Sequence, residues 1–343
     1  VKQLDQSMYQ QWDAYVAKHH DGTFYHLSGW KPVIEQAFSH PCYFAYVVKS
    51  GMITAVLPLV HVKSRLFGNA LVSTPFCMHG GVLSDSTADF ELLVEFAKSL
   101  ALRLNVQYVE FRNKITEHSD PLLVSPSQDS HVVFSTKLAA NDDDILLSIK
   151  KKQRAVIRQS LKNNLSYHIE DNVENIYHIY SYSVRNLGTP VFSKKLFKLL
   201  LQIFPNQCEV MTVFHKNVAV SSVMSFYYKG TVLPHFAGGL KAARALKSND
   251  FMYYQLMCHS QGKRDCEVFD FGRSKVDSGA YHYKRHWGME PVAVSNHYFL
   301  HRASELPNLN VTNPKYALAI KYWKKLPLSL SQVLGPQLSK YLG

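Results

Sequence analysis

The stretch CEVMTVFHKNVAVSSVMSFYY, residues 208–228, consists of two apolar runs that flank a polar His-Lys-Asn triplet. Two apolar runs of this kind, joined by a short polar turn, predict a β-hairpin. A second such stretch, YFAYVVKSGMITAVLPLVHV at residues 43–62, has Lys-Ser-Gly at its turn. Because the hairpin pattern occurs once in each half of the chain, the sequence suggests that one structural unit is present twice.

The segments after each hairpin are repeated in the same order. Each half continues with a strand that ends in a Gly pair, an amphipathic helix, and an apolar strand that ends in Arg. The Gly pairs are Gly80-Gly81 and Gly238-Gly239, the helices are expected at 87–104 and 249–262, and the arginines are Arg112 and Arg273. We therefore expect an α/β (α+β) fold of two tandem units, each with a mixed, largely antiparallel sheet flanked by helices.

The boundary between the units is expected where LAANDDD, residues 138–144, interrupts the pattern. This places a first unit at 1–140, a second unit at 141–311 that begins with a basic helix, and a basic amphipathic tail at 312–343. The tail interleaves Tyr, Leu and Trp with Lys. It is compatible with contact to an anionic membrane, but we favour a C-terminal helix packed on the second unit.

The chain has 343 residues and a net charge of +12, which favours anionic partners such as nucleic acid, nucleotide phosphates or an anionic membrane face. Its five cysteines form no CxxC pair, which favours a reducing compartment. The polar N-terminus does not resemble a signal peptide, and no apolar run approaches the roughly 18 residues of a membrane span. We expect a cytoplasmic protein, either free or peripheral at the inner face of the membrane.

Residues 145–169 contain six Lys or Arg and no acidic residue. Four of these cations are spaced 3, 4 and 4 apart, which places them on one stripe of a helix. They are Lys151, Arg154, Arg158 and Lys162. Ile149, Val156 and Leu161 are expected to face inward. The stripe suits phosphates and would make nucleic-acid binding salt-sensitive; the alternative is a solvated helix face paired with acids from elsewhere.

A second basic segment is LPHFAGGLKAARALKSNDFMYYQLM, residues 233–257. The Gly pair is followed by a loop with three cations and by a helix that opens at Ser248. A helix N-terminus with nearby cations attracts anions, because its first backbone N–H groups are free. The residues expected to bind the phosphates of a donor are Gly238, Gly239, Lys241, Arg244, Lys247, Ser248 and Asn249, with Lys151, Arg154 and Arg158 of the basic helix.

Several catalytic motifs are absent from the sequence. HExxH, G-x-S-x-G, the P-loop and G-x-G-x-x-G do not occur, so nothing supports a zinc protease, a hydrolase triad, an NTPase or a dinucleotide enzyme. The 17 histidines are expected to be satisfied or exposed, and no metal site is expected.

The order of helix, hairpin, strand, Gly loop, helix and strand resembles the GNAT (N-acetyltransferase) fold, and two such units in one chain resemble the FemAB family. The likeness is strongest to FemAB-like proteins of exosortase/PEP-CTERM and exopolysaccharide systems. It rests on SRLFGNALVSTPF (64–76), RNLGTPVFSKKLF (185–197), KSNDFMYYQLM (247–257), FDFGRSKVDSGAYHYKRHWGMEP (269–291) and NPKYALAIKYWKKLPLSLSQVLGP (313–336).

The resemblance implies transfer of an acyl or aminoacyl group to an amine or hydroxyl of a cell-envelope or exopolysaccharide precursor. FemAB enzymes use aminoacyl-tRNA and modify peptidoglycan precursors; acyl-CoA is also an open donor here, and neither a tightly bound cofactor nor DNA binding is implied. Where relatives hold the diphosphate of a UDP-linked precursor, this chain has Ile34 and Phe192 in place of Lys and Arg. This difference argues against a UDP-muropeptide acceptor. The alternative function is a non-catalytic module that binds a glycolipid or a protein partner.

The same resemblance points to site residues. FemAB transferases carry a Lys in a Tyr-x-x-Lys motif that assists acyl transfer, and Tyr281–Lys284 matches this motif. Lys284 is the first catalytic candidate, and Arg273 is a second cation for the developing oxyanion. Glu110 and Asp270, at corresponding strand ends, are candidate bases, although Asp270 is also placed to pair with Arg273. The residues expected to bind the substrate are Trp30, Arg112, Tyr281 and Tyr283.

Overall fold

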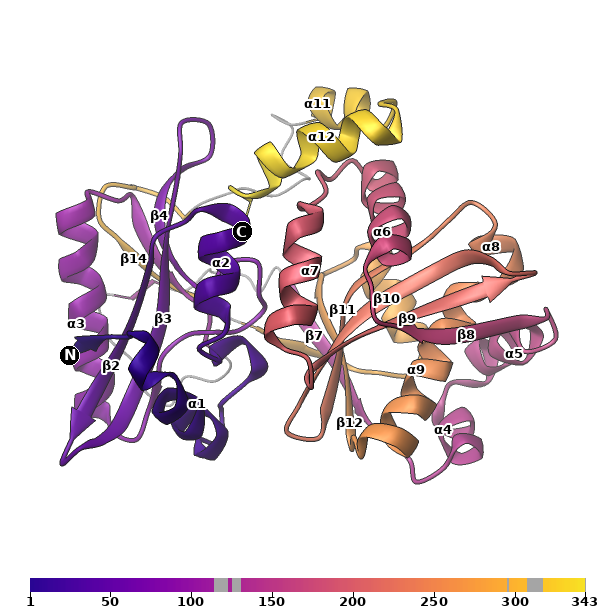
Figure 1. Cartoon of the computed structure of the whole chain (residues 1–343), viewed down its shortest axis with the longest axis horizontal. Helices are drawn as coiled ribbons and strands as arrows, with labels where there is room; N and C mark the ends of the chain where they lie inside the picture. The colour runs from indigo at the N-terminus through magenta and orange to yellow at the C-terminus, as the bar shows by residue number, and fades with distance from the viewer. Residues whose placement is uncertain (114–122, 125–130, 295, 307–316, 343) are drawn as a thin grey trace. The chain divides into compact units, whose positions relative to one another are not determined.

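Figure 1 shows the computed structural model of the chain, which describes residues 1–113, 123–124, 131–294, 296–306 and 317–342. The chain divides into two compact units. Unit 1 consists of Val1–Asp129, Val294–Asn310 and Ser339–Gly343, and unit 2 consists of Ser130–Ala293 and Val311–Leu338.

The sheet of unit 1 follows the order β1-β2-β3-β4-β6-β14, with β5 paired to β3. Its strands are β1 (Lys2–Gln3), β2 (Cys42–Lys49), β3 (Met52–Ser64), β4 (Gly68–Ser73), β5 (Leu83–Ser84), β6 (Tyr108–Phe111) and β14 (His297–Leu300). β4 and β6 run parallel, and the other pairs of neighbouring strands are antiparallel. The helices are η1 (Gln6–Met8), α1 (Tyr9–Lys18), η2 (Phe24–His26), α2 (Trp30–Phe38) and α3 (Thr87–Leu104).

The sheet of unit 2 follows the order β13-β7-β12-β11-β10-β9-β8. Its strands are β7 (His131–Lys137), β8 (Leu165–Glu170), β9 (Cys208–His215), β10 (Val218–Tyr228), β11 (Thr231–Gly239), β12 (Val268–Lys275) and β13 (Pro291–Ala293). β11 and β12 are parallel, and the other neighbouring strands are antiparallel. The helices are α4 (Asp142–Ser148), α5 (Lys151–Ser160), α6 (Glu174–Leu187), α7 (Lys194–Ile203), α8 (Ala243–Leu246), α9 (Ser248–Arg264), α10 (Gly279–His286), α11 (Ala317–Trp323) and α12 (Leu328–Ser339).

The internal repeat predicted from the two hairpins is present in the structure (Figure 1). In unit 1, β2 and β3 form the hairpin and β4, α3 and β6 follow; in unit 2, β9, β10, β11, α9 and β12 have the same order and pairing. In each unit the helix carries the chain back, so that the last strand runs parallel to the strand before the helix. The predicted fold class, two mixed and largely antiparallel sheets flanked by helices, is confirmed.

Helix α3 has the bounds predicted from its sequence. Ser86 caps its N-terminus by accepting a backbone hydrogen bond, and Asn105 ends it in the left-handed conformation at φ +51°. Its buried side chains, such as Leu93, belong to one apolar cluster with Leu57 of β3. The corresponding helix α9 begins one residue before and ends two residues after the predicted 249–262.

Pairing between distant segments shifts the expected unit boundaries. β7 precedes the expected boundary at residue 140, but it pairs with β12 and belongs to unit 2. β14 falls within the expected second unit, 141–311, but it pairs with β6 and belongs to unit 1. Strand pairing between distant segments leaves no local pattern in the sequence, so the boundaries could not be located from periodicity.

The Gly pair of the first half does not end a strand, contrary to the prediction. β4 ends at Ser73, and the N–H groups of Gly80 and Gly81 both donate to the carbonyl oxygen of Arg112 at 3.1 Å. A Cβ on Gly81 would lie 1.7 Å from Asn113 Oδ1, so this close approach requires glycine. In the second half the prediction was correct, because Gly239 is the last residue of β11.

Helices α11 and α12 of the tail pack on unit 2. Arg185 donates from Nη1 to the carbonyl oxygen of Leu326 at 2.6 Å, and a Cβ on Gly188 would lie 2.4 Å from Ile320. Residues 339–343 belong to unit 1 instead. Most of the tail therefore packs on unit 2, as expected for a C-terminal helix, and does not form a separate segment at 312–343. No helix in the described parts of the chain is long and apolar enough to cross a bilayer.

Gly238→Ala is expected to lower the free energy of unfolding by about 1–3 kcal/mol, because overpacking forces the neighbouring atoms apart. An added Cβ would lie 2.7 Å from Ser183 Oγ and 2.9 Å from the carbonyl oxygen of Ile179 in α6. Gly262→Ala in α9 is the matched control, because nothing lies within 4 Å of its added Cβ and alanine is favoured over glycine in a helix by about 1 kcal/mol. Urea denaturation compares the two variants, and equal stability would contradict the packing described.

Candidate active site

Helix α10 presents Lys284 to the sheet of unit 2. Ser278 caps the helix by accepting the Tyr281 N–H at 3.2 Å, which fixes the first turn. Lys284 lies in the last turn and is only 8% exposed. Its Nζ donates to the carbonyl oxygens of Gly272 at 2.9 Å and Arg273 at 3.1 Å. The ammonium of the Tyr-x-x-Lys motif therefore lies against the backbone of β12.

A β-bulge in β12 makes this contact feasible. The register between β12 and β7 shifts between Asp270 and Gly272, and Gly272 has φ +78°, a conformation that favours glycine. Successive carbonyls of a regular strand point to opposite edges, yet those of Gly272 and Arg273 both reach one nitrogen. Asp270 stabilises the bulge, because its Oδ1 accepts the Gly272 N–H at 2.9 Å.

Two aromatic rings lie close to the Lys284 ammonium. Nζ is 5.4 Å from the ring centre of Phe271 and 5.9 Å from that of Phe134, within the range of cation–π attraction. Burial lowers the pKa of Lys284 to about 8, and the charge of Asp270 opposes this shift. The side chain is thus a largely desolvated cation that remains mostly protonated at pH 7.

Lys284 lies beyond the end of the ladder that joins β11 and β12. Only two residue pairs connect these parallel strands, Thr231 with Val268 and Val232 with Phe269. Past them, β11 stays paired with β10, and β12 stays paired with β7, to their ends. Within the described strands, the ladder between β11 and β12 therefore ends before the stretch of β12 that Lys284 contacts.

The N-terminus of α9 contains buried polar atoms that no described residue satisfies. Ser248 is fully buried, and within the described residues neither its Oγ nor Asn249 Oδ1 has a hydrogen-bond partner. A Cβ on Gly239 would lie 2.7 Å from Asn249 Oδ1, so the glycine keeps this turn compact. Three sequence-predicted donor-binding residues, Gly239, Ser248 and Asn249, thus lie together at the start of α9.

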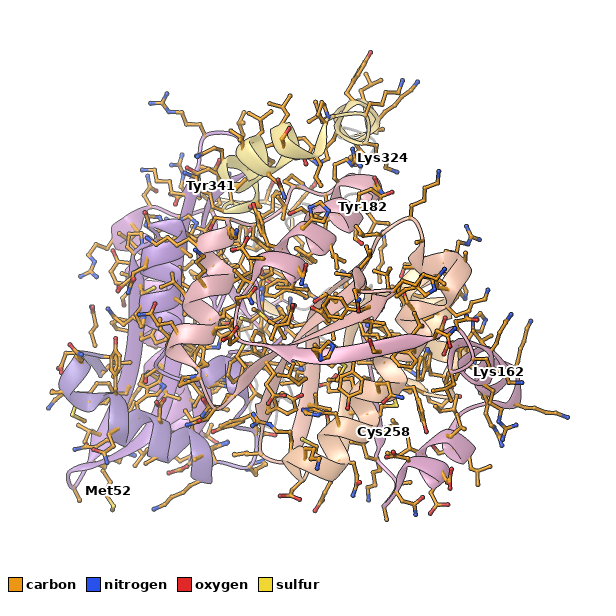
Figure 2. All side chains as sticks on the ribbon, turned by 45° about the vertical axis from the view of Figure 1, so that its right-hand side comes forward. Met52, Lys162, Tyr182, Cys258, Lys324 and Tyr341 are labelled. Carbon is orange, nitrogen blue, oxygen red and sulfur yellow. The ribbon has the colours of Figure 1, made fainter. Side chains whose placement is uncertain are left out.

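Helix α5 lies beside the junction of α8 and α9. Gln153 donates from Nε2 to Asp250 Oδ1 at 2.6 Å, and Asn163 donates from Nδ2 to the carbonyl oxygen of Leu246 at 2.8 Å. The predicted cationic stripe lines a surface pocket of about 460 Å³. The pocket residues are Lys151, Arg154, Ala155, Arg158, Gln159 and Lys162. In Figure 2 the side chains around Lys162 point away from the ribbon at the edge of unit 2.

The inward face of α5 differs from the prediction. Ile149 is buried, but Leu161 is 43% exposed, and the helix buries Gln153, Ile157 and Ser160 instead. The helical conformation is interrupted at Ile149, which is extended at ψ 141° between α4 and α5. A new helix starts at Lys151, so the residues that face inward cannot be counted on from Ile149. A polar residue at a buried position, Gln153, was missed because its partner Asp250 is distant in sequence.

Tyr281 and Tyr283 hold α10 in place. Tyr283 donates to Asp250 Oδ1 at 3.0 Å, and burial raises the pKa of its hydroxyl, reinforced by the Asp250 charge. Tyr281 packs edge-on against Phe134 with ring centres 5.4 Å apart. One carboxylate oxygen, Asp250 Oδ1, therefore accepts hydrogen bonds from both α5 and α10.

Three predicted site residues, Trp30, Glu110 and Arg112, belong to unit 1. Arg112 and Glu110 form a buried ion pair with Nε and Oε1 2.9 Å apart, and Asn296 also donates to this oxygen at 2.7 Å. Arg112 further donates to the carbonyl oxygen of Cys77 at 2.9 Å. Trp30 is 2% exposed, and its indole N–H is bound to a backbone carbonyl of η2. Among the described residues, these side chains are buried in unit 1 and bonded to its own groups; their role in binding a substrate stays a prediction.

Comparison with known proteins agrees with this fold. Residues 151–285, from α5 to α10, match the acetyltransferase (GNAT) domain family model. The structure of FemX superposes with a TM-score of 0.68 at 13% identity, covering 93% of this chain and all of FemX. A tandem GNAT protein from the clavulanic acid biosynthesis pathway gives 0.54 at 9% identity, covering 88% of this chain and 97% of its own.

A third similar structure is the C-terminal domain of a putative lysylphosphatidylglycerol synthetase from Agrobacterium fabrum, with a TM-score of 0.52 at 11% identity over 86% of this chain and 92% of that domain. No curated protein sequence matched the chain. At these identities the structural likeness establishes the fold. Residues 151–285 are therefore similar to the acetyltransferase (GNAT) domain family, within a tandem fold similar to that of FemX.

Proposed function

We propose that this chain is an acyltransferase of the GNAT/FemAB type. It moves an acyl or aminoacyl group from a phosphate-bearing donor to an amine or hydroxyl of a cell-envelope or exopolysaccharide precursor, including those of exosortase/PEP-CTERM systems. The observation that carries the proposal is the buried Lys284 ammonium, held at the bulge of β12 beyond the two residue pairs that join β11 and β12. A desolvated cation at a fixed position is the group that acyl transfer requires for charge developing on a carbonyl oxygen.

In the proposed reaction the acceptor nitrogen or oxygen forms a bond to the carbonyl carbon of the donor. The bond from this carbon to the thiol sulfur of CoA, or to the ribose oxygen of tRNA, breaks, and the acceptor proton passes to the leaving group or to water. Lys284 stabilises the oxyanion, with Arg273 as a second cation. Asp270 supports this role by stabilising the bulge, since its Oδ1 accepts the Gly272 N–H. Holding donor and acceptor together supplies much of the rate.

The donor phosphates are assigned to the stripe on α5 and to the start of α9. The cations of the stripe line a pocket next to the α8–α9 junction, and among the described residues Ser248 Oγ and Asn249 Oδ1 have no hydrogen-bond partner. Lys241, Arg244 and Lys247 of the preceding segment add positive charge. Acyl-CoA and aminoacyl-tRNA both carry phosphates that these groups can bind. A binding measurement therefore decides which of the two is the donor.

The proposed acceptor is not a UDP-linked precursor. Ile34 is fully buried in α2, and Phe192 packs against Phe236 with ring centres 5.9 Å apart. Neither apolar side chain can replace a cation that binds a diphosphate. A lipid-linked or polysaccharide acceptor is consistent with this loss.

A donor is expected to stabilise the chain, because a ligand present at 100 times its Kd adds about 2.7 kcal/mol to the free energy of unfolding. Thermal unfolding is measured with acetyl-CoA, longer acyl-CoAs and a charged tRNA side by side. The variant with Lys151, Arg154, Arg158 and Lys162 all replaced by Gln should lose the shift. A control with Lys2, Lys18, Lys63 and Lys216 replaced by Gln has the same change in charge at other exposed positions and should keep it. Equal loss of the thermal shift in both variants would show that it depends on net charge alone and not on the stripe.

Lys284→Met is expected to lower kcat/KM by about 10²–10³ with the donor identified in that screen, because one oxyanion donor is removed. Transfer to a panel of amines and amino sugars is measured. Lys263→Met, at an exposed position on α9, is the matched control. Unchanged activity in a folded Lys284→Met protein would refute the catalytic role and favour a non-catalytic binding module.

Lys284 should also make stability depend on pH. Its pKa of about 8 in the folded chain lies below the ordinary value of 10.5. Between these values the unfolded chain binds a proton that the folded chain does not, so stability rises with pH through this window. Relative to Lys284→Met, the wild type should gain up to about 3 kcal/mol from pH 8 to pH 10.5 in urea titrations. Parallel pH profiles for the two proteins would show that the ammonium is not desolvated.

A further inference from the structure

The C-terminal helix pair, α11 and α12, packs on unit 2 through buried residues of α12, whereas α11 has no fully buried residue. Ser331 is 1% exposed, and a Cβ on Gly335 would lie 2.8 Å from the carbonyl oxygen of Val191. Close packing of this kind fixes the orientation of the pair on unit 2. The side chains on its other faces are therefore held in defined positions at the surface.

Both helices of the pair carry large apolar side chains that are exposed. Leu318, Tyr322 and Val333 are 69%, 68% and 68% exposed, and Leu330 and Leu334 are each 42% exposed. Leu318 and Tyr322 are four residues apart, and Leu330, Val333 and Leu334 are three and four apart, so each set shares one side of its helix. A group of apolar side chains in one short segment is unusual on a monomer surface and often marks a contact with another partner.

Positive charge accompanies these apolar residues. Lys321, Lys324 and Lys325 are exposed, and residues 306–343 contain five lysines and no aspartate or glutamate. In Figure 2, Lys324 lies at the helix pair, where several nitrogen-tipped side chains point away from the ribbon. The segment thus combines cations with exposed leucine, valine and tyrosine side chains.

We propose that the C-terminal helix pair binds the surface of an anionic lipid bilayer. Leu318, Tyr322 and Val333 enter the boundary between headgroups and acyl chains, and the lysines contact the anionic headgroups. Neither helix is long enough to span a bilayer, so the pair lies on the surface. Two copies of this segment would bring like charges together, and nucleic acid would leave the apolar side chains in water. The proposal does not depend on the proposed catalysis, because binding to vesicles is measured without substrate.

The test is flotation of the full chain with phosphatidylcholine vesicles that contain or lack phosphatidylglycerol. We expect the chain to float only with the anionic vesicles. Replacing Lys321, Lys324 and Lys325 by Gln should lower the partition coefficient by about 10–100-fold. Replacing Lys2, Lys18 and Lys216 by Gln is the control, because these exposed lysines lie elsewhere and the change in net charge is the same.

The apolar contribution is tested in the same assay. Leu318→Ser, Tyr322→Ser and Val333→Ser together should reduce flotation at high as well as low salt, since burial of apolar surface is not screened. The matched control replaces Met52, Leu66 and Val218, which are also exposed, by Ser. Circular dichroism confirms that each variant folds.

Three results would overturn the proposal. They are failure of the wild type to bind anionic vesicles, equal loss of binding in the control and test variants, and a concentration-dependent dimer that the apolar variant abolishes while vesicles remain unbound. The last result would assign the surface to a second copy of the chain.

Discussion

A buried ammonium must be surrounded by groups that replace its water, and the arrangement of unit 2 around Lys284 meets this requirement. Carbonyl oxygens of β12 accept its hydrogen bonds, ring faces from β7 and β12 lie near it, and Asp270 supplies a nearby negative charge. Leaving such a charge unpaired in a protein interior costs several kcal/mol. The bulge, the glycine at its centre and the distant strand β7 therefore all contribute to stabilising the desolvated ammonium.

The two units share a topology but use corresponding residues differently. In unit 1, Glu110 at the end of β6 neutralises Arg112, and the pair is closed off in the core. In unit 2, Asp270 at the corresponding position accepts a backbone N–H of the bulge, and Lys284 arrives from the following helix. An acidic residue that completes an ion pair in one copy stabilises a backbone irregularity in the other. The repeated fold thus permits one unit to be structural where the other presents a desolvated cation.

Local signals in the sequence predicted the repeated elements well. The hairpins, the bounds of α3 and the stripe on α5 follow from periodicity, turns and caps, which depend on neighbouring residues. The pairing of β7 with β12 and of β14 with β6 could not be predicted, because it joins segments with no pattern in common. For the same reason the sequence indicated the Tyr-x-x-Lys motif at Lys284 but not the ring of Phe134 beside it. The substrate role expected for Trp30 stays a prediction, and its burial was not evident from the sequence.

Asp250, in the first turn of α9, links the two helices that carry the candidate site residues, α5 and α10. A single oxygen, Asp250 Oδ1, receives hydrogen bonds from Gln153 of α5 and from Tyr283 of α10. Hydrogen bonds at this one oxygen therefore connect the helix that carries the cationic stripe with the helix that carries Lys284. A change in the position of either helix alters the geometry at an acceptor that the other helix also uses.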